Sequence, residues 1–205
     1  MTLTPADVRE YDEQAGAATE TATFALGCFW GPDAEFGALD GVIKTRVGYA
    51  GGTKRDPSYH ALGDQTEALQ VDFDPTVVSY TELLDRAFQL HDPHNQTRTT
   101  QYQNIVFVAT TSQRDALTAW LEANGLTGDG IETRIEQLSQ FHLAEDYHQK
   151  HSLRGEDRLL NAFTEAGYDD EAIRESPAAA VVNAHAAGHD TNGLDLPDRQ
   201  TIRFR

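Results

Sequence analysis

The sequence contains one cysteine, Cys28, at a position where a nucleophile would be expected. An alternating run at residues 23–26 predicts a short strand that ends at Gly27. Pro32 and the acidic residues around it favour the first turn of a helix. The free N–H groups and the dipole at a helix start favour a thiolate over a thiol, so we expect a reactive Cys28. From position alone, a buried and inert thiol is the alternative.

Two large aromatic residues, Phe29 and Trp30, follow the cysteine directly. Large aromatic side chains most often belong to a core, and that is the simpler interpretation. The alternative is an apolar wall beside the sulfur. A nucleophilic sulfur next to such a wall could hold a small apolar group and attack it.

The cysteine motif GCFWG is followed by GYAGG at residues 48–52 and by AEDYHQ at residues 144–149. Together these motifs resemble the peptide methionine sulfoxide reductase A family, over roughly residues 22–153. The resemblance implies an α+β fold: a two-layer α/β sandwich, or ferredoxin-like roll, with a mixed sheet and helices packed on it. It also implies reduction of methionine-S-sulfoxide, free or in proteins, to methionine.

The resemblance also implies roles for individual residues. In this family the cysteine that matches Cys28 attacks the sulfoxide sulfur and becomes a sulfenic acid. Phe29 and Trp30 would form the pocket for the substrate's S-methyl group. Glu67 would be the acid that protonates the sulfoxide oxygen, and burial beside aromatic rings would raise its pKa. An ordinary exposed glutamate at a strand end is the alternative.

Two tyrosines lie in motifs similar to those of the family, Tyr59 in DPSY and Tyr102 in TQY. Each hydroxyl is expected to donate a hydrogen bond to the sulfoxide oxygen. Two phenols and one carboxyl group around a polarised oxygen would form an oxyanion-type clamp. Each tyrosine alone could instead be a packing residue.

The sequence departs from the family pattern in three places. Gln65-Thr66 stand where the family has a His–Ala pair, and the loop before Tyr102 is short and lacks the family's aspartate. No second cysteine is present to resolve a sulfenic acid. An external thiol must therefore reduce it, which could be thioredoxin, glutaredoxin or a small thiol. We expect neither a cofactor nor a metal, because the histidines lack paired ligand spacing.

The segment at residues 141–150, which contains AEDYHQ, is expected to support the site without taking part in the reaction. We expect Asp146, Tyr147 and His148 to form a polar network that braces it. Two other functions remain open at this stage. One is a one-cysteine peroxidase, and the other is a redox-sensing domain of weakened activity.

The composition limits the possible partners. The formal net charge is −17, from 33 acidic and 16 basic residues, so no basic surface is expected for nucleic acid. Such acidity is typical of proteins adapted to high salt, which screens self-repulsion. No apolar run approaches the roughly 18 residues of a membrane span. With a polar N-terminus, these features predict a cytoplasmic protein, which we expect to be a monomer.

The elements that must position these residues follow from periodicity. We expect a loosely held lead at residues 1–22, in which a short helix could follow Thr4-Pro5, a catalytic domain at 23–167 and a partly irregular extension at 168–205. The mixture of strands and helices predicts one sheet layered with helices. Strands are predicted at 23–27, 42–49, 68–73, 104–109 and 131–138. Helices are predicted at 28–39, 82–91, 112–124, 144–153, 158–165 and 177–185.

Overall fold

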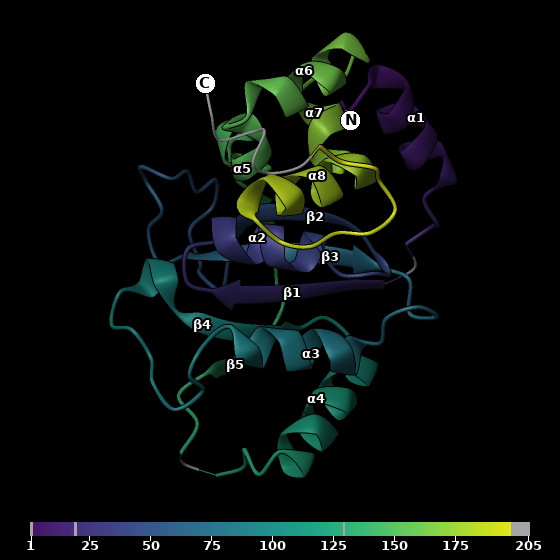
Figure 1. Cartoon of the computed structure of the whole chain (residues 1–205). Coiled ribbons are helices and arrows are strands. Elements are labelled where there is room, and N and C mark those ends of the chain that lie inside the picture. The colour runs from purple at the N-terminus through teal and green to yellow at the C-terminus, as the bar shows by residue number, and fades with distance from the viewer. Residues whose placement is uncertain (1, 19, 129, 198–205) are drawn as a thin grey trace.

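The computed structural model describes residues 2–18, 20–128 and 130–197, and its strands form one sheet (Figure 1). The strand order is β5-β4-β1-β3-β2-β6. Neighbouring strands are antiparallel except β4 and β5, which are parallel. The α+β fold with a mixed sheet is therefore confirmed. The strands are β1 (Glu20–Leu26), β2 (Val42–Ala50), β3 (Thr66–Phe73), β4 (Asn104–Val108), β5 (Arg134–Gln137) and β6 (Phe141–Leu143).

Helices α2, α3 and α4 agree with the predicted ones. Ser79 and Glu82, for example, form the capping box that opens α3. The α-helices are α1 (Pro5–Gln14), α2 (Trp30–Gly37), α3 (Tyr80–Gln89), α4 (Thr111–Ala123), α5 (His151–Arg154), α6 (Asp157–Glu165), α7 (Asp170–Glu175) and α8 (Pro177–Ala187). Two 3₁₀ turns are η1 (Thr100–Tyr102) and η2 (Asp146–His148).

The predicted helix at 144–153 is wrong. Only η2 and the short helix α5 form there, because Lys150 between them has a φ of 54°, in the left-handed region. Strand β6 and helix α7 were not predicted. Strand β6 has three residues, which is too short for an alternating pattern to stand out.

The strands bury different side chains on their two faces, as the period of two requires. On one face, Phe24 of β1 packs with Leu69 of β3 and Val106 of β4 in the main core, which helices α2, α3 and α4 complete. On the other face, Ala25 and Ile105 belong to a smaller cluster. The helices thus form a layer on the sheet.

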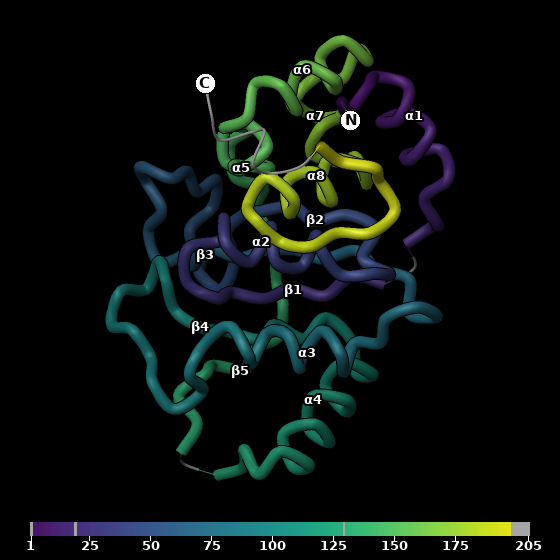
Figure 2. The backbone as a smooth tube through the Cα atoms, viewed as in Figure 1, coloured from purple at the N-terminus to yellow at the C-terminus, as the bar shows by residue number. Residues whose placement is uncertain are grey.

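Helix α1, near the N-terminus, packs against helices from the last third of the chain (Figures 1 and 2). Helix α1 begins with a capping box at Thr4 and buries Val8 in a cluster with residues of α6 and α8. Asp12 of α1 also accepts hydrogen bonds from the backbone N–H of Ala178 at 2.7 Å and from the hydroxyl of Tyr168 at 2.8 Å. The expected loose lead is therefore a docked helix.

A buried polar network lies under helix α2, which begins just after Cys28. Asp33 of α2 accepts hydrogen bonds from the hydroxyl of Thr45 in β2 and from the amide of Asn183 in α8. The ammonium of Lys150 lies 3.5 Å from the Asp33 carboxylate and donates to the Thr45 carbonyl at 2.6 Å. Helix α2 is thus tied to the sheet and to the C-terminal helix.

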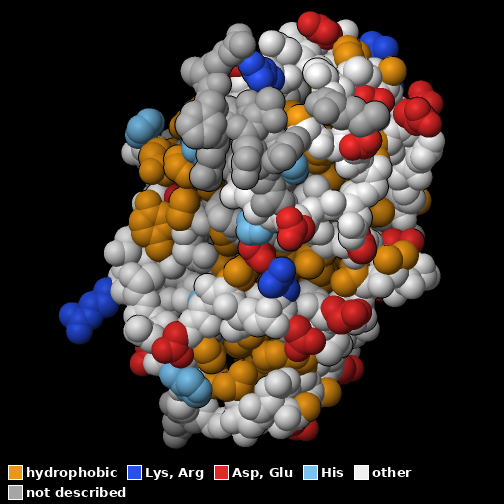
Figure 3. Space-filling model, viewed as in Figure 1, with side chains coloured by type: hydrophobic (Ala, Val, Ile, Leu, Met, Phe, Trp, Pro, Cys, Tyr) orange, Lys and Arg blue, Asp and Glu red, His pale blue; other side chains and the backbone are white. Residues whose placement is uncertain are grey.

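The surface of the molecule reflects its composition. Acidic side chains are scattered over the face in Figure 3, and few Lys or Arg side chains accompany them. None of the helices in the described part of the chain combines the length and apolar character that a bilayer crossing needs.

Candidate active site

Cys28 lies in the turn between β1 and α2, exposed at the surface. Gly27 before it has a φ of 74°, which a residue with a side chain rarely adopts. The backbone N–H of Trp30 donates a hydrogen bond to the sulfur, as expected at a helix start. Desolvation and the charge of Glu67 nevertheless raise the pKa of the thiol. The net direction of this pKa shift is opposite to the one that the helix start alone predicts.

Glu67 is the second residue of β3 and lies opposite Tyr49 of β2. Its side chain is buried, with 1% exposure. The carboxylate accepts hydrogen bonds from the Phe29 backbone N–H at 3.1 Å and from the Gln101 amide at 2.7 Å. Burial raises the pKa of Glu67, and the two hydrogen bonds only partly oppose it. The expected buried carboxyl group with a raised pKa is confirmed.

The two tyrosines join the same cluster. Tyr102 ends η1, and burial is the main cause of its raised pKa. The charge of Glu67, a hydrogen bond with the Tyr59 side chain and the charge of Cys28 raise that pKa further. Tyr102 therefore interacts with Cys28, Glu67 and Tyr59, and Cys28 with Glu67, although the four residues come from four separate segments.

The two residues that depart from the family pattern fasten the loops on either side of Glu67. Gln65 accepts a hydrogen bond from the Gly52 N–H at 3.0 Å and donates one to the Lys54 carbonyl at 2.9 Å. The hydroxyl of Thr66 donates to the Thr100 carbonyl at 2.8 Å, which attaches η1 to β3. These contacts hold the short loops in place.

The aromatic pair is divided between the core and the surface. Phe29 is 1% exposed and belongs to the main core. Trp30 is half-buried and stacks on His151 of α5, with ring centroids 3.6 Å apart and an interplanar angle of 3°. Trp30 lines an open hollow of about 560 Å³. This hollow, called the Trp30 hollow below, is lined by Trp30, Tyr59, His60, Tyr147, His148, His151, Arg154 and Gly155.

The bracing role of the AEDYHQ segment falls on residues that sequence reasoning missed. Glu145 accepts hydrogen bonds from the Tyr49 hydroxyl at 2.7 Å and from the Tyr59 N–H at 2.9 Å. The amide of Gln149 bonds both the N–H and the carbonyl of Val47 in β2. Both residues lie in the AEDYHQ motif, so the motif did indicate a bracing segment. The bracing role was predicted for the residues between them instead.

The neighbours themselves do not form the predicted network. Asp146 is an outer residue whose carboxylate lies 3.8 Å from the Arg174 guanidinium, and Tyr147 is 53% exposed. His148 is buried, but neither ring nitrogen has a hydrogen-bond partner. Instead its ring packs against the aromatic rings of Phe29 and Tyr59.

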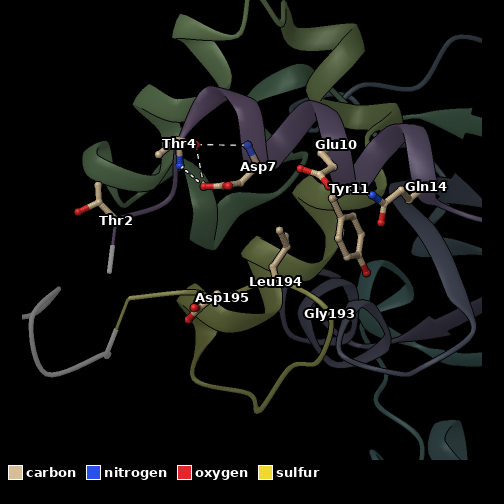
Figure 4. A pocket seen from close by; sticks show the side chains of 9 residues that line it. All are labelled: Thr2, Thr4, Asp7, Glu10, Tyr11, Gln14, Gly193, Leu194 and Asp195. Carbon is tan, nitrogen blue, oxygen red and sulfur yellow. Dashed lines mark hydrogen bonds between the residues drawn. The ribbon is translucent and has the colours of Figure 1, made fainter.

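A metal centre and a second hollow are the alternatives to this cluster. Within residues 2–18, 20–128 and 130–197, no three His, Cys, Asp or Glu side chains are grouped as metal ligands. Another hollow, of about 420 Å³, lies between α1 and residues 193–195 (Figure 4). The Asp7 carboxylate, which lines this hollow, already accepts a hydrogen bond from the Thr4 backbone N–H in the capping box of α1. Neither Cys28 nor any other member of its cluster lines it.

Comparison with known proteins explains this arrangement. A family model described as peptide methionine sulfoxide reductase matches residues 20–176. The chain belongs to this family. The match begins at β1 and stops just before α8, so α1 and α8 lie outside the residues that the family model matches.

Several relatives support the assignment. Peptide methionine sulfoxide reductase A5 of Oryza sativa is 38% identical over 182 residues, which cover 84% of this chain and 70% of the rice protein. The enzyme MsrA of Methanococcoides burtonii is 40% identical over 144 residues, covering 64% of this chain and 94% of that protein. The structure of methionine sulfoxide reductase A of Corynebacterium diphtheriae has a TM-score of 0.57 at 31% identity, covering 68% of this chain and 76% of that one. The protein is therefore a peptide methionine sulfoxide reductase.

Proposed function

We propose that this reductase acts on the S epimer of methionine sulfoxide, free or in proteins, with Cys28 as its nucleophile. The observation that supports this most directly is the cluster itself. An accessible sulfur shares one electrostatic environment with a buried carboxyl group, Glu67, and with the phenols of Tyr59 and Tyr102. A nucleophile, an acid and two donors are what reduction of a sulfoxide needs.

In the first step, the Cys28 thiolate attacks the sulfoxide sulfur. Glu67 transfers its proton to the sulfoxide oxygen, while the hydroxyls of Tyr59 and Tyr102 donate hydrogen bonds to it. The sulfur–oxygen bond of the substrate then breaks and the hydroxyl passes to the Cys28 sulfur. The substrate sulfur is reduced by two electrons to methionine, and Cys28 is oxidised to a sulfenic acid.

The second half of the cycle requires another molecule, because the sequence holds no second cysteine. An external thiol attacks the sulfenic acid, releases water and leaves a mixed disulfide on Cys28. A second thiol then frees Cys28 and leaves as a disulfide with the first. Thioredoxin, glutaredoxin or a small thiol could supply these electrons.

The experiment compares the wild type with Cys28→Ser, using dithiothreitol and the S or R epimer of N-acetylmethionine sulfoxide, or hydrogen peroxide. We expect turnover of the S epimer alone, and its loss in the variant. Turnover of peroxide only would support a one-cysteine peroxidase. No turnover of any of the three would support a redox-sensing domain.

A mass measurement tests the one-cysteine cycle separately. After one turnover without reductant, we expect one added oxygen on the peptide that contains Cys28. With a thiol present, the same peptide should carry that thiol as a mixed disulfide. An unmodified Cys28 after formation of a full equivalent of methionine would contradict the proposed mechanism.

A further inference from the structure

We propose that the Trp30 hollow is a carboxylate-binding subsite that holds the α-carboxylate of the substrate. The enzyme would then favour methionine sulfoxide with a free carboxylate, as the amino acid itself or as the last residue of a peptide. This inference rests on the proposed function and names the substrate class of the same site.

The side chains of the Trp30 hollow differ in charge from the rest of the protein. Among the eight lining residues are one arginine and three histidines, and no aspartate or glutamate. The whole chain carries 33 acidic and only 16 basic residues. Two carboxylates lie behind the lining, Glu145 at 4.0 Å from the Nε2 of His148 and Asp170 beside Arg154, but neither is part of it. The lining itself, which has no acidic group, is a favourable place for an anion. Arg154 supplies a permanent positive charge there, since a guanidinium stays protonated.

Arg154 is only partly engaged by the protein. Its Nε donates to the Gln149 carbonyl at 2.8 Å, and its Nη1 pairs with Asp170 at 2.8 Å. Asp170 is 55% exposed at its side chain, so solvent weakens that pair. The remaining nitrogen, Nη2, is buried and has no hydrogen-bond partner. A rotation of the guanidinium toward a bound carboxylate would give this nitrogen an acceptor.

Two other residues of the hollow also carry unused polar atoms. His148 is 2% exposed, and both of its ring nitrogens lack a partner. The indole Nε1 of Trp30 is buried without a partner as well. Buried donors without acceptors are rare in folded proteins because they cost stability. Three such side chains around one hollow indicate that an acceptor belongs there.

The hollow has the position and the size for the substrate. Trp30 lies two residues after Cys28, and its ring stacks on His151. Tyr59, a member of the Cys28 cluster, also lines the hollow, so the hollow adjoins that cluster. Arg154 follows His151 by three residues on α5, about one helical turn or 5 Å farther along. A volume of about 560 Å³ easily holds one amino acid.

The test compares two substrates that differ only in the carboxylate, N-acetylmethionine-S-sulfoxide and its C-terminal amide, both with dithiothreitol. We expect the wild type to use the acid with a kcat/KM about tenfold higher, as for a hydrogen bond to a charged group. In Arg154→Gln, kcat/KM for the acid should fall to that for the amide, while the amide is used as before. Arg154→Lys, which keeps the charge, should retain part of the preference.

Arg114→Gln provides a matched control, because it removes an arginine from α4, where its side chain bonds Gln137. It should leave the preference for the acid unchanged. Equal use of both substrates by the wild type would overturn the proposal, as would an equal loss of both in Arg154→Gln. Turnover of the amide in these cases would still support the function of Cys28.

The carboxylate that binds in the Trp30 hollow could also belong to a reducing thiol such as glutathione. If Arg154→Gln raises KM for glutathione but not for dithiothreitol, and the acid-to-amide ratio is unchanged, the subsite belongs to the reductant. That result would overturn the assignment to the substrate.

Discussion

Replacing Glu67 by glutamine tests whether a buried carboxylic acid supplies the proton. Glutamine has nearly the same size, and its carbonyl oxygen can still accept the hydrogen bond from the Phe29 N–H, now 3.1 Å from the carboxylate. The amide of Gln101, 2.7 Å away, can turn to present its own oxygen. The fold should therefore survive while the acid is lost. Loss of a general acid predicts a fall in kcat of about 10² to 10⁴.

The pH dependence gives the sharper test. The active form has a proton on Glu67 and none on Cys28, and both groups have raised pKa values. Between these two pKa values, a rise of one pH unit increases the fraction of Cys28 thiolate tenfold and decreases the fraction of protonated Glu67 tenfold. The rate therefore does not change with pH in this range. As the pH drops below the Glu67 pKa, the rate falls because the fraction of Cys28 thiolate falls. As the pH rises above the Cys28 pKa, the rate falls because the fraction of protonated Glu67 falls.

In Glu67→Gln only Cys28 titrates, so the rate should rise about tenfold per pH unit until the thiol ionises. That ionisation should occur at lower pH than in the wild type, because the charge of Glu67 no longer raises the pKa of Cys28. The assays are kcat/KM for N-acetylmethionine-S-sulfoxide and the rate of Cys28 alkylation by iodoacetamide, each against pH. Glu122→Gln, an exposed change on α4, is the control. A wild-type rate and profile in Glu67→Gln would refute the reasoning.

Two further substitutions test the packing under the site, measured by urea unfolding. Lys150→Met removes a fully buried ammonium and leaves the Asp33 carboxylate without its cation, so the free energy of unfolding should fall by about 3–5 kcal/mol. Adding Asp33→Asn should restore part of this loss, and a stable single variant would count against the network. In Gly37→Ala the new Cβ would lie 2.6 Å from the Ala180 carbonyl oxygen of α8, which should cost about 1–3 kcal/mol. In Gly31→Ala, on the same helix, the new Cβ would have no atom within 4 Å, so this change should be neutral or stabilising by up to about 1 kcal/mol. Equal effects of the two glycine substitutions would contradict this account of the packing.

The sequence predicted which residues of the site come together better than it predicted their supports. Cys28, Glu67 and Tyr102 each stand in a local motif that resembles one of the family, so their roles could be proposed before any contact was known. The strands and the longer helices were predictable because each has its own period and its own caps, such as Ser79 with Glu82. These signals are local, and a local signal can be read from the sequence.

The supports depend on contacts between distant segments, which leave no local pattern. Asp12 and Ala178 meet only because α1 and α8 pack together, and neither segment by itself indicates that contact. The left-handed Lys150 breaks a helical pattern that the sequence otherwise favours. Glu145 was passed over because nothing in its own segment indicates that Tyr59 would lie beside it.

The raised pKa of Cys28 changes how the resting enzyme is understood. The helix start does supply its N–H donor, but desolvation and the charge of Glu67 outweigh it, so the free thiol stays largely protonated. A protonated thiol reacts slowly with peroxides, because the thiolate is the reactive form. That protection matters for a chain with no second cysteine to capture a sulfenic acid before further oxidation. In the proposed reaction, Glu67 would transfer its proton to the sulfoxide oxygen at the same time as the Cys28 sulfur attacks the sulfoxide sulfur. The cluster can thus be slow toward unspecific oxidants and still act on its bound substrate.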